Sequence, residues 1–239
     1  MAVYRTLPTA TADGSAVITP SRIGKYLEAY TMPLELPRDY ANEGSYFVTY
    51  NVTDGTGIAG HAAPVQADLS TKPLLHIFNG GSKSILVDFV RIRMSVIGAG
   101  SSTTDFTAWI DNNGSTVKSS GGTVATAVNC RGDQPSTTGA IVSFGAVVAT
   151  AGATEKRIDH QRLRSTVSVV EDQYVFDFGS GAYGPPTGGI TMAGTGVVGL
   201  YVKMAPAVIL PGGNFKLVKW AASQSGADSY EYTVGWVER

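Results

Sequence analysis

The side chains best suited to bind a metal ion are three histidines, His61, His76 and His160, which lie far apart in the sequence. A structural or catalytic zinc site needs several ligands with ordered partners behind them, and neither HExxH nor a Cys–His pair occurs here. Cys130 is the only cysteine, which rules out an intrachain disulfide and a thiolate cluster. The run 111–114 (DNNG) is similar to part of a calcium loop but lacks the later acidic ligand. We therefore predict no metal site.

The densest charged run is 155–164 (EKRIDHQRLR), where Asp159 beside His160 could transfer protons. No nucleophile motif such as GxSxG accompanies it, and the glycine-rich run 179–184 has no following GK[ST]. The tripeptide 131–133 (RGD) matches an integrin-binding motif, but so short a match indicates a surface turn. The sequence leaves a glycosidase-type pair of carboxylates undecided, because the two partners of such a pair come together only in the folded protein. We interpret 155–164 as a solvated loop or a subunit contact, and predict no catalytic residue, enzyme activity or cofactor.

The composition is that of a folded protein with few charges. Of the 239 residues, 43% are hydrophobic and 15% are charged, and the net charge is −1. Near-neutral charge predicts no general attraction to nucleic acid or anionic lipid. The sequence contains neither an apolar run of about 20 residues nor a signal-peptide core, so we expect no membrane span and synthesis in the cytoplasm. Low charge is typical of a subunit that buries much of its surface against neighbours.

Alternating apolar and polar residues predict an antiparallel, jelly-roll-like β-sandwich over residues 73–239, an all-β fold. In 230–236, aromatic and apolar residues alternate with Glu231, Thr233 and Gly235. In 83–96, we place Leu86, Val90, Ile92, Met94 and Val96 on one face, with a bulge near Asp88. The expected strands are 74–79, 83–96, 105–111, 139–148, 162–170, 173–178, 196–204, 214–220 and 230–237. Gly80-Gly81-Ser82 should close a hairpin, and Gly121-Gly122 a turn.

Residues 1–72 differ from the rest because prolines interrupt them and few stretches alternate. We predict an extended N-terminal arm that contains a short helix over 21–30, extended chain over 33–37 and a strand over 43–53. Such a segment cannot build its own core. It should therefore lie on its own sandwich or clasp a neighbouring subunit through its large side chains. The predicted partner-interface residues are Tyr4, Ile23, Tyr26, Leu27, Tyr30, Leu34, Leu36 and Tyr40.

Three blocks carry a resemblance to a known family. They are 43–64 (EGSYFVTYNVTDGTGIAGHAAP), 73–96 (PLLHIFNGGSKSILVDFVRIRMSV) and the ending 205–239, with an apolar run, Pro-Gly and a final GWVER. Together they resemble structural proteins of tailed-bacteriophage virions. The resemblance implies a cement or decoration protein on the head that binds the major capsid protein and copies of itself, usually as a homotrimer. The alternative is a tail- or fibre-associated module that binds a receptor or glycan. No functional residue carries over, because these motifs are packing patterns.

Overall fold

The computed structural model describes residues 22–23, 29–30, 36–64, 70–100, 103–114, 118–164, 166–179, 190–191 and 197–239. The chain divides into two units, Met1–Asp39 and Tyr40–Arg239. The compact second unit therefore begins at Tyr40, whereas the sequence analysis placed the start of the sandwich at residue 73. The expectation that the protein is all-β is confirmed.

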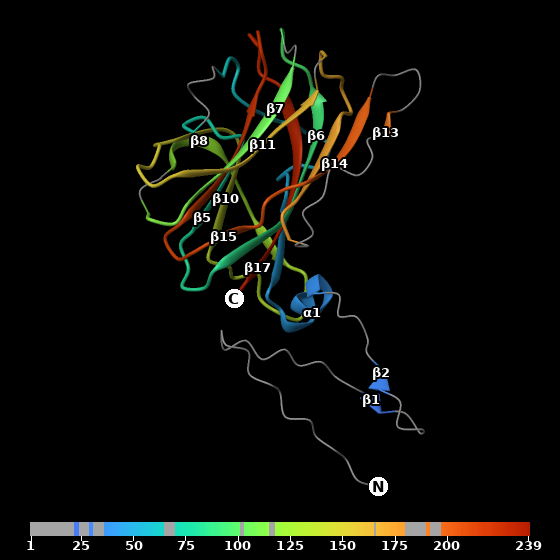
Figure 1. The fold of residues 1–239 in the computed structure, drawn as a ribbon, viewed down its shortest axis with the longest axis vertical. Helices are drawn as coiled ribbons and strands as arrows, with labels where there is room; N and C mark the ends of the chain where they lie inside the picture. Colours follow the sequence, from blue (N-terminus) through green and yellow to red (C-terminus); the bar gives the residue numbers. More distant parts are fainter. Residues whose placement is uncertain are drawn as a thin grey trace. The chain divides into compact units, whose positions relative to one another are not determined.

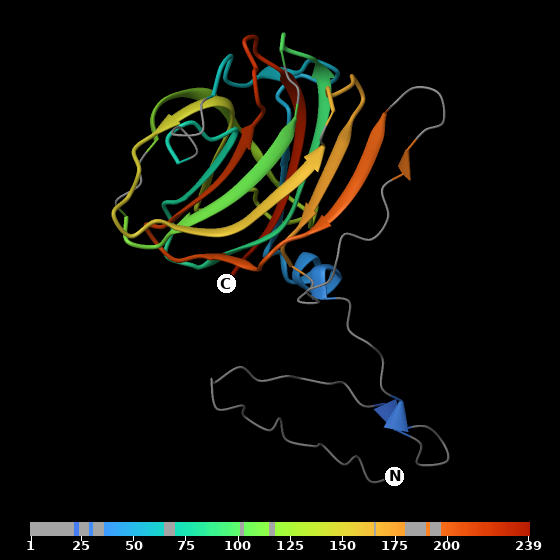
Figure 2. The ribbon, with the colours of Figure 1, turned by 45° about the horizontal axis from the view of Figure 1, so that its top comes forward.

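Two large sheets form a β-sandwich and appear as curved layers in Figures 1 and 2. The six-stranded sheet has the order β11-β7-β16-β5-β10-β8, with strands at Leu75–Asn79 (β5), Thr104–Asp111 (β7), Lys118–Ala125 (β8), Ala140–Ala149 (β10), Lys156–Arg164 (β11) and Asn214–Trp220 (β16). The second sheet has the order β13-β14-β12-β6-β17-β3-β9, with β15 paired to β6 and β4 paired to β17. Its strands are Tyr46–Tyr50 (β3), Ile58–Ala59 (β4), Ile85–Val96 (β6), Ala127–Asn129 (β9), Gln173–Asp177 (β12), Ile190–Thr191 (β13), Val198–Lys203 (β14), Ala207–Ile209 (β15) and Ser229–Glu238 (β17).

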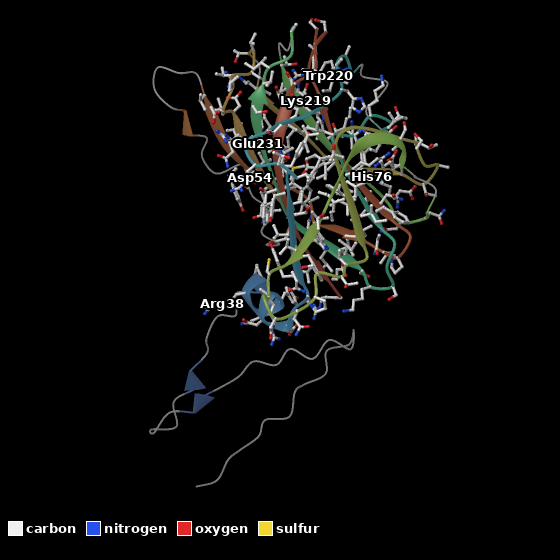
Figure 3. The ribbon with its side chains drawn as sticks, turned by 180° about the vertical axis from the view of Figure 1, so that it is seen from behind. Arg38, Asp54, His76, Lys219, Trp220 and Glu231 are labelled. Carbon is white, nitrogen blue, oxygen red and sulfur yellow. The ribbon has the colours of Figure 1, made fainter. Side chains whose placement is uncertain are left out.

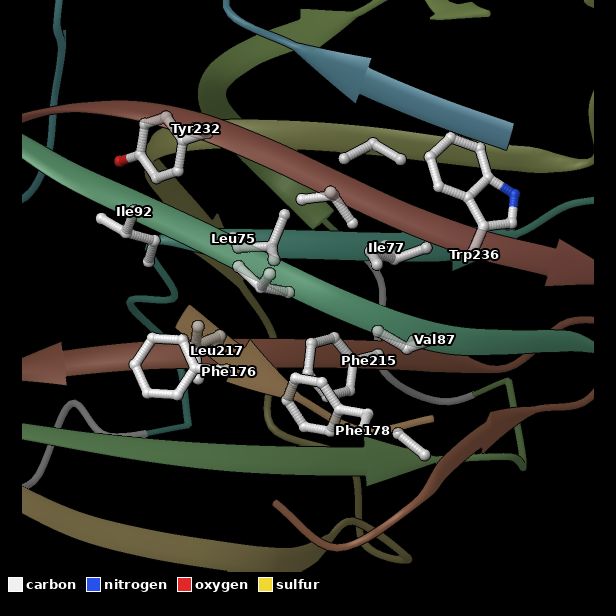
Figure 4. Close-up of a cluster of buried hydrophobic side chains, with 14 of the residues drawn as sticks. Leu75, Ile77, Val87, Ile92, Phe176, Phe178, Phe215, Leu217, Tyr232 and Trp236 are labelled. Carbon is white, nitrogen blue, oxygen red and sulfur yellow. The ribbon is translucent and has the colours of Figure 1, made fainter. Parts of the chain in front are cut away.

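Strand β17 shows how alternation in the sequence becomes a buried face. Tyr230, Tyr232, Val234 and Trp236 are at most 2% exposed, as the period-two pattern predicts. Figure 4 shows Tyr232 and Trp236 beside side chains from β5, β6 and β16. Burying a large apolar side chain contributes about 1.5–3 kcal/mol, so this strand is a major source of stability.

Aromatic pairs join the two sheets across the core. Phe144 of β10 stacks on Tyr232 of β17 at 4.6 Å between ring centroids. Phe106 of β7 meets Phe176 of β12 at 4.8 Å, with the rings tilted by 59°. Tilted and offset rings are favourable because the positive edge of one ring meets the negative face of the other. These contacts fix the sheets face to face.

The bulge predicted near Asp88 is present. Gly235 is opposite Phe89, but the next residue, Trp236, is opposite Val87, which leaves Asp88 as the extra residue of β6. The bulge shifts the inward face of β6 by one residue, so Val87 is buried. Leu86, which the simple alternation placed inward, is only partly buried.

The predicted hairpin at Gly80-Gly81-Ser82 is wrong. Strand β5 pairs with β10 and β16 in the six-stranded sheet, whereas β6 pairs with β12 and β17 in the other sheet. The three residues therefore lead the chain from one sheet to the other. The local turn chemistry is compatible with both outcomes, and the long-range partners of each strand decide between them.

Two edge regions also differ from expectation. The charged run that we interpreted as a loop is β11, an edge strand paired only with β7 within the described part of the chain. Charged side chains on an edge oppose pairing with other molecules, so their density here is consistent with a strand. The predicted turn at Gly121-Gly122 lies inside β8, where both glycines have positive φ and the register with β10 shifts.

One neighbouring pair of strands, β12 and β14, is parallel, so the second sheet is not wholly antiparallel as predicted. The segment between them contains β13, which pairs antiparallel with β14. A parallel pair needs a long connection, and about 20 residues separate the two strands here.

The region before residue 73 contributes to the sandwich. Strand β3 lies between β17 and β9, and Phe47 stacks on Trp236 at 6.0 Å. The predicted helix over 21–30 is wrong at its four described residues, which form the paired strands Arg22–Ile23 (β1) and Ala29–Tyr30 (β2). The observed helix is Leu36–Glu43 (α1), where extended chain was predicted to reach residue 37. Gly44, with φ +75°, ends it.

Gly145 should be among the least replaceable glycines. It lies at the irregularity of β10 with φ +91°, and an added Cβ would come within 2.5 Å of Ile58 Cγ2 and 2.7 Å of the Ala59 carbonyl oxygen. We expect Gly145→Ala to lower the free energy of unfolding by about 1–3 kcal/mol, measured by urea denaturation. Gly132→Ala is the matched control, because nothing lies within 4 Å of its Cβ position. Equal stability of the two variants would contradict the argument.

Candidate functional site

The outer face of the nine-stranded sheet presents a continuous row of side chains across five strands. Tyr201 of β14 is opposite Val175 of β12, which is opposite Arg91 of β6. Arg91 is in turn opposite Thr233 of β17, and Thr233 is opposite Tyr50 of β3. The row exists because odd and even positions of each strand face opposite sides of a sheet. The inward neighbours of these residues form the core.

Beside this row the surface is hollowed by two open depressions of about 300 and 290 Å³ that share Arg91, Glu231 and Thr233. We call them together the outer-face depression. Figure 3 labels Asp54 and Glu231 on this side of the molecule. Apart from glycine, the lining residues are all polar or aromatic: Tyr50, Asn51, Asp54, Arg91, Arg93, Gln173, Glu231, Tyr232 and Thr233.

Hydrogen bonds hold some groups of the outer-face depression and leave others available. Arg93 donates to Glu171 at 2.6 Å and to Glu231 at 3.0 Å. The Glu171 contact raises the pKa of Arg93, so that guanidinium is held in its charged form. Arg91 donates only to the Thr233 hydroxyl, at 2.9 Å, among the described residues. Because a guanidinium has five N–H donors, most of those on Arg91 face solvent.

The loop at the edge of the outer-face depression is fixed by Asn51. Its side-chain amide donates to the Thr56 carbonyl at 2.8 Å, and its oxygen accepts from the Tyr232 backbone N–H at 2.7 Å. These two bonds tie the β3–β4 loop to β17. The neighbouring ring of Tyr50 is 50% exposed, so a rigid aromatic surface stands beside the polar groups.

Several ionisable groups elsewhere in the described chain are buried in the protein. Lys216 pairs with Glu155 on the outer side of the six-stranded sheet, and both are nearly inaccessible to solvent. Burial lowers the pKa of Lys216 and raises the pKa of Glu155, while their mutual attraction opposes both shifts. Nearby, His76 Nε2 bonds Asn214 Oδ1 at 3.0 Å. Burial is the main cause that lowers the pKa of His76 to about 4.

A second buried pair fastens loops together. Lys219 donates to Asp228, whose other oxygen accepts from the Gly98 backbone N–H at 2.6 Å. Gln224 accepts from Lys219 at 2.8 Å and donates to the His61 carbonyl at 3.0 Å. The adjoining cavity of about 10 Å³ has room for a single water molecule. Lys219 thus links three loops rather than facing a substrate.

A third buried ionic group joins β11 to the β12 end of the other sheet. Asp172 is fully buried and accepts from Arg164 at 2.9 Å. It also accepts from the backbone N–H groups of Val169 and Val198, each at 2.8 Å. A carboxylate with several charge-assisted bonds holds each donor in place. This group stabilises the fold and is closed to solvent.

Catalysis requires a titratable group with a suitable pKa in an accessible place. The buried groups with shifted pKa, such as Lys216 and Glu155, are nearly inaccessible to solvent. In the outer-face depression, Glu231 is engaged by Arg93. The arrangement is therefore suited to binding a ligand through hydrogen bonds and ring contacts.

The sequence candidates for chemistry stay apart. His160 Nδ1 bonds the Thr107 hydroxyl at 2.9 Å on edge strand β11. Arg131 binds Asp133 of its own turn at 2.7 Å, and burial raises the pKa of Cys130, which disfavours a reactive thiolate. No cluster of three metal-ligating side chains occurs among the residues that the structure describes.

The predicted interface residues fall mostly outside the described side chains. Tyr4, Tyr26, Leu27 and Leu34 lie outside the described residues. The backbone of Ile23 lies in β1 and that of Tyr30 in β2, while Leu36 begins α1. Tyr40 belongs to the compact unit, where its ring lies 5.0 Å from the guanidinium carbon of Arg239 and its hydroxyl accepts from Arg239 at 2.9 Å.

Sequence reasoning missed the outer-face depression as a site. The alternation in β6 correctly placed Arg91 and Arg93 on the outer side of that strand. Their meeting with Glu231 depends on the pairing of β6 with β17, two strands that residues 97–228 separate along the chain. The sequence signal that could have indicated this site has two parts. Arg91 and Arg93 are two residues apart and so share one face of β6, and Glu231 and Thr233 form a polar face on the final strand.

No family model, curated protein sequence or solved structure matches this chain. Within the described residues, no helix has the length and apolar character needed to cross a membrane.

Proposed function

We propose that this chain is a non-enzymatic structural protein of a tailed-bacteriophage virion that decorates and stabilises the capsid. Its partners are the major capsid protein and copies of itself, as a homotrimer, and it binds neither nucleic acid nor membrane. It is made in the host cytoplasm and then occupies the capsid surface. The resemblance of the three sequence blocks supports this role. It is also supported by a β-sandwich whose buried ion pairs hold strands and loops together.

The observation that carries the proposal is the division of the chain at residue 39. In this proposal, the unit that precedes Tyr40 serves as an extended arm. That segment is rich in large side chains, and their burial against a neighbour would offset the entropy lost on ordering, about 1–2 kcal/mol per residue. An arm of this kind would link folded subunits into a lattice without chemistry.

The finer fold assignment, a jelly roll, belongs to the same proposal. The chain moves between the two sheets several times: β5 lies in one sheet, β6 in the other, and β7 in the first again. Repeated crossing of this kind is typical of jelly rolls, which occur in viral capsid domains. The β12–β14 parallel pair would be a local addition at one sheet edge.

A truncation tests the proposed arm. The full chain should form a trimer in native mass spectrometry, and a variant that lacks residues 1–35 should remain folded but monomeric. The cut keeps α1 intact, so the folded unit is not disturbed. The physical reason is that the removed segment holds most of the proposed interface residues.

The double variant Tyr26→Ala/Leu27→Ala is the companion test, because it weakens the proposed arm and leaves the chain length unchanged. Circular dichroism and thermal melting control for folding. A full chain that is monomeric, or a truncated chain that still forms the same trimer, would overturn the arm. Copy number in purified particles separates cement from tail: hundreds of copies support the capsid role, and a few dozen or fewer contradict it.

A further inference from the structure

We propose that the outer-face depression is a binding site for a neutral oligosaccharide. The site lies on β6 and β17, beside the β3–β4 loop, within the unit that begins at Tyr40. This inference is independent of the capsid role, since it concerns a different surface from the proposed arm.

The hydrogen-bonding groups of the site match the hydroxyl groups of a sugar, which both donate and accept. Arg91 offers N–H donors, and Asp54 offers carboxylate acceptors. Gln173 offers both in one planar amide. Within the described part of the chain, neither Gln173 nor Asp54 has a side-chain hydrogen-bonding partner. These groups can therefore exchange water for a polyhydroxylated ligand without first breaking an internal bond.

An aromatic ring completes the pattern. Tyr50 is half exposed at one end of the cross-strand row, and Tyr201 is 39% exposed at the other end. Four strand spacings of roughly 4.8 Å separate the backbone positions of the two tyrosines by about 19 Å. That span suits a chain of several sugar rings better than a single sugar. A tyrosine ring presents an apolar face with a polar tip, which fits the apolar face and hydroxyl rim of a pyranose.

The balance of charge favours a neutral ligand. Arg93 is neutralised by Glu171 and Glu231. Among the other lining residues, the negative charge of Asp54 offsets the positive charge of Arg91. A strongly anionic polysaccharide would meet these carboxylates, and an apolar partner would have to strip water from every polar group that lines the site. A neutral polyhydroxylated chain meets neither cost.

The groups of the site are held in place before a ligand arrives. Glu231 accepts from Arg93 at 3.0 Å, which fixes the position of its carboxyl group. Asn51 fixes the adjoining loop through its two bonds to Thr56 and Tyr232, so the site is formed before a ligand arrives. Such pre-organisation reduces the entropy lost on binding.

Isothermal titration of the full chain with cellohexaose, maltohexaose, mannohexaose and chitohexaose tests the proposal, with polygalacturonate as the anionic probe. We expect at least one neutral oligosaccharide to bind. Arg91→Ala and Tyr50→Ala should each weaken that binding at least tenfold. Arg91→Lys, which keeps the charge but loses the planar fork, should weaken it as well.

Arg157→Ala is the matched control, because Arg157 is an exposed arginine on a strand of the other sheet. This variant should bind the oligosaccharide with the same affinity as the unmodified protein. Both arginines and Tyr50 are exposed, so melting temperatures should be unchanged and loss of binding cannot be ascribed to unfolding. The proposal is overturned if none of the four neutral oligosaccharides binds, if only polygalacturonate binds, or if the Arg91 and Tyr50 variants bind like Arg157→Ala.

Discussion

Replacing Asp172 by asparagine is expected to lower the free energy of unfolding by about 3–5 kcal/mol, because it removes one partner of a buried ion pair. Arg164 would keep its charge while only 9% of its side chain is exposed. The Val169 and Val198 N–H groups would also exchange a carboxylate acceptor for a weaker amide or lose it. Urea denaturation at neutral pH measures the difference.

Asp133→Asn is the matched control for this substitution. Asp133 also pairs with an arginine, Arg131, but 64% of its side chain is exposed, and exposed pairs contribute about 0–1 kcal/mol. The double variant Asp172→Asn/Arg164→Met should recover part of the loss, because the buried charge itself is removed. If Asp172→Asn is no less stable than Asp133→Asn, the buried pair does not stabilise the fold as argued.

The strands were the most predictable part of this fold, because side-chain alternation is a local signal. Strand β16 has the predicted bounds, Asn214–Trp220, and β17 differs from its prediction by one residue at each end. The bulge at Asp88 was also predictable, since a carboxylate interrupts the inward face of an otherwise regular strand. Each of these features is set by residues that are neighbours in the sequence.

Pairing partners were not predictable, because contacts between distant segments determine them. The turn at Gly80 fits both a hairpin and a crossing between sheets. Strand β3 would show the same alternation if it packed on a neighbouring subunit or if it paired with β17 of its own chain. The packing of Phe47 on Trp236 decides its place. The outer-face depression was missed for the same reason, since it exists only where β6, β17 and the β3–β4 loop meet.

The second large effect should appear in acid. His76 is 2% exposed, and burial lowers its pKa from 6.5 to about 4. Lys216 and Lys118 also disfavour its protonation, whereas the bond to Asn214 favours it. Lys216 is itself paired with the acidic residue Glu155. The imidazole is therefore neutral in the folded protein over most of the physiological range.

The sign follows from proton binding in the two states. Between pH 6.5 and about 4 the unfolded chain protonates His76 while the folded protein does not, so protons favour unfolding. The stabilisation is complete above pH 6.5 and is lost as the pH falls towards 4. One pKa unit corresponds to about 1.4 kcal/mol, so the full difference is on the order of 3 kcal/mol. Glu155 contributes with the opposite sign, because burial raises its pKa and the folded state then holds its proton more tightly.

His76→Gln separates the two contributions, because glutamine keeps an amide that can bond Asn214 but does not titrate. Unfolding free energies of both proteins should be measured by urea denaturation from pH 7.5 to 4. The variant should be less stable than the unmodified protein near neutrality, and the gap should shrink by about 3 kcal/mol towards pH 4. His160→Gln, at an exposed position of β11, is the control for replacing a histidine by glutamine. A gap between His76→Gln and the unmodified protein that stays constant with pH would show that His76 is not held neutral by its buried surroundings.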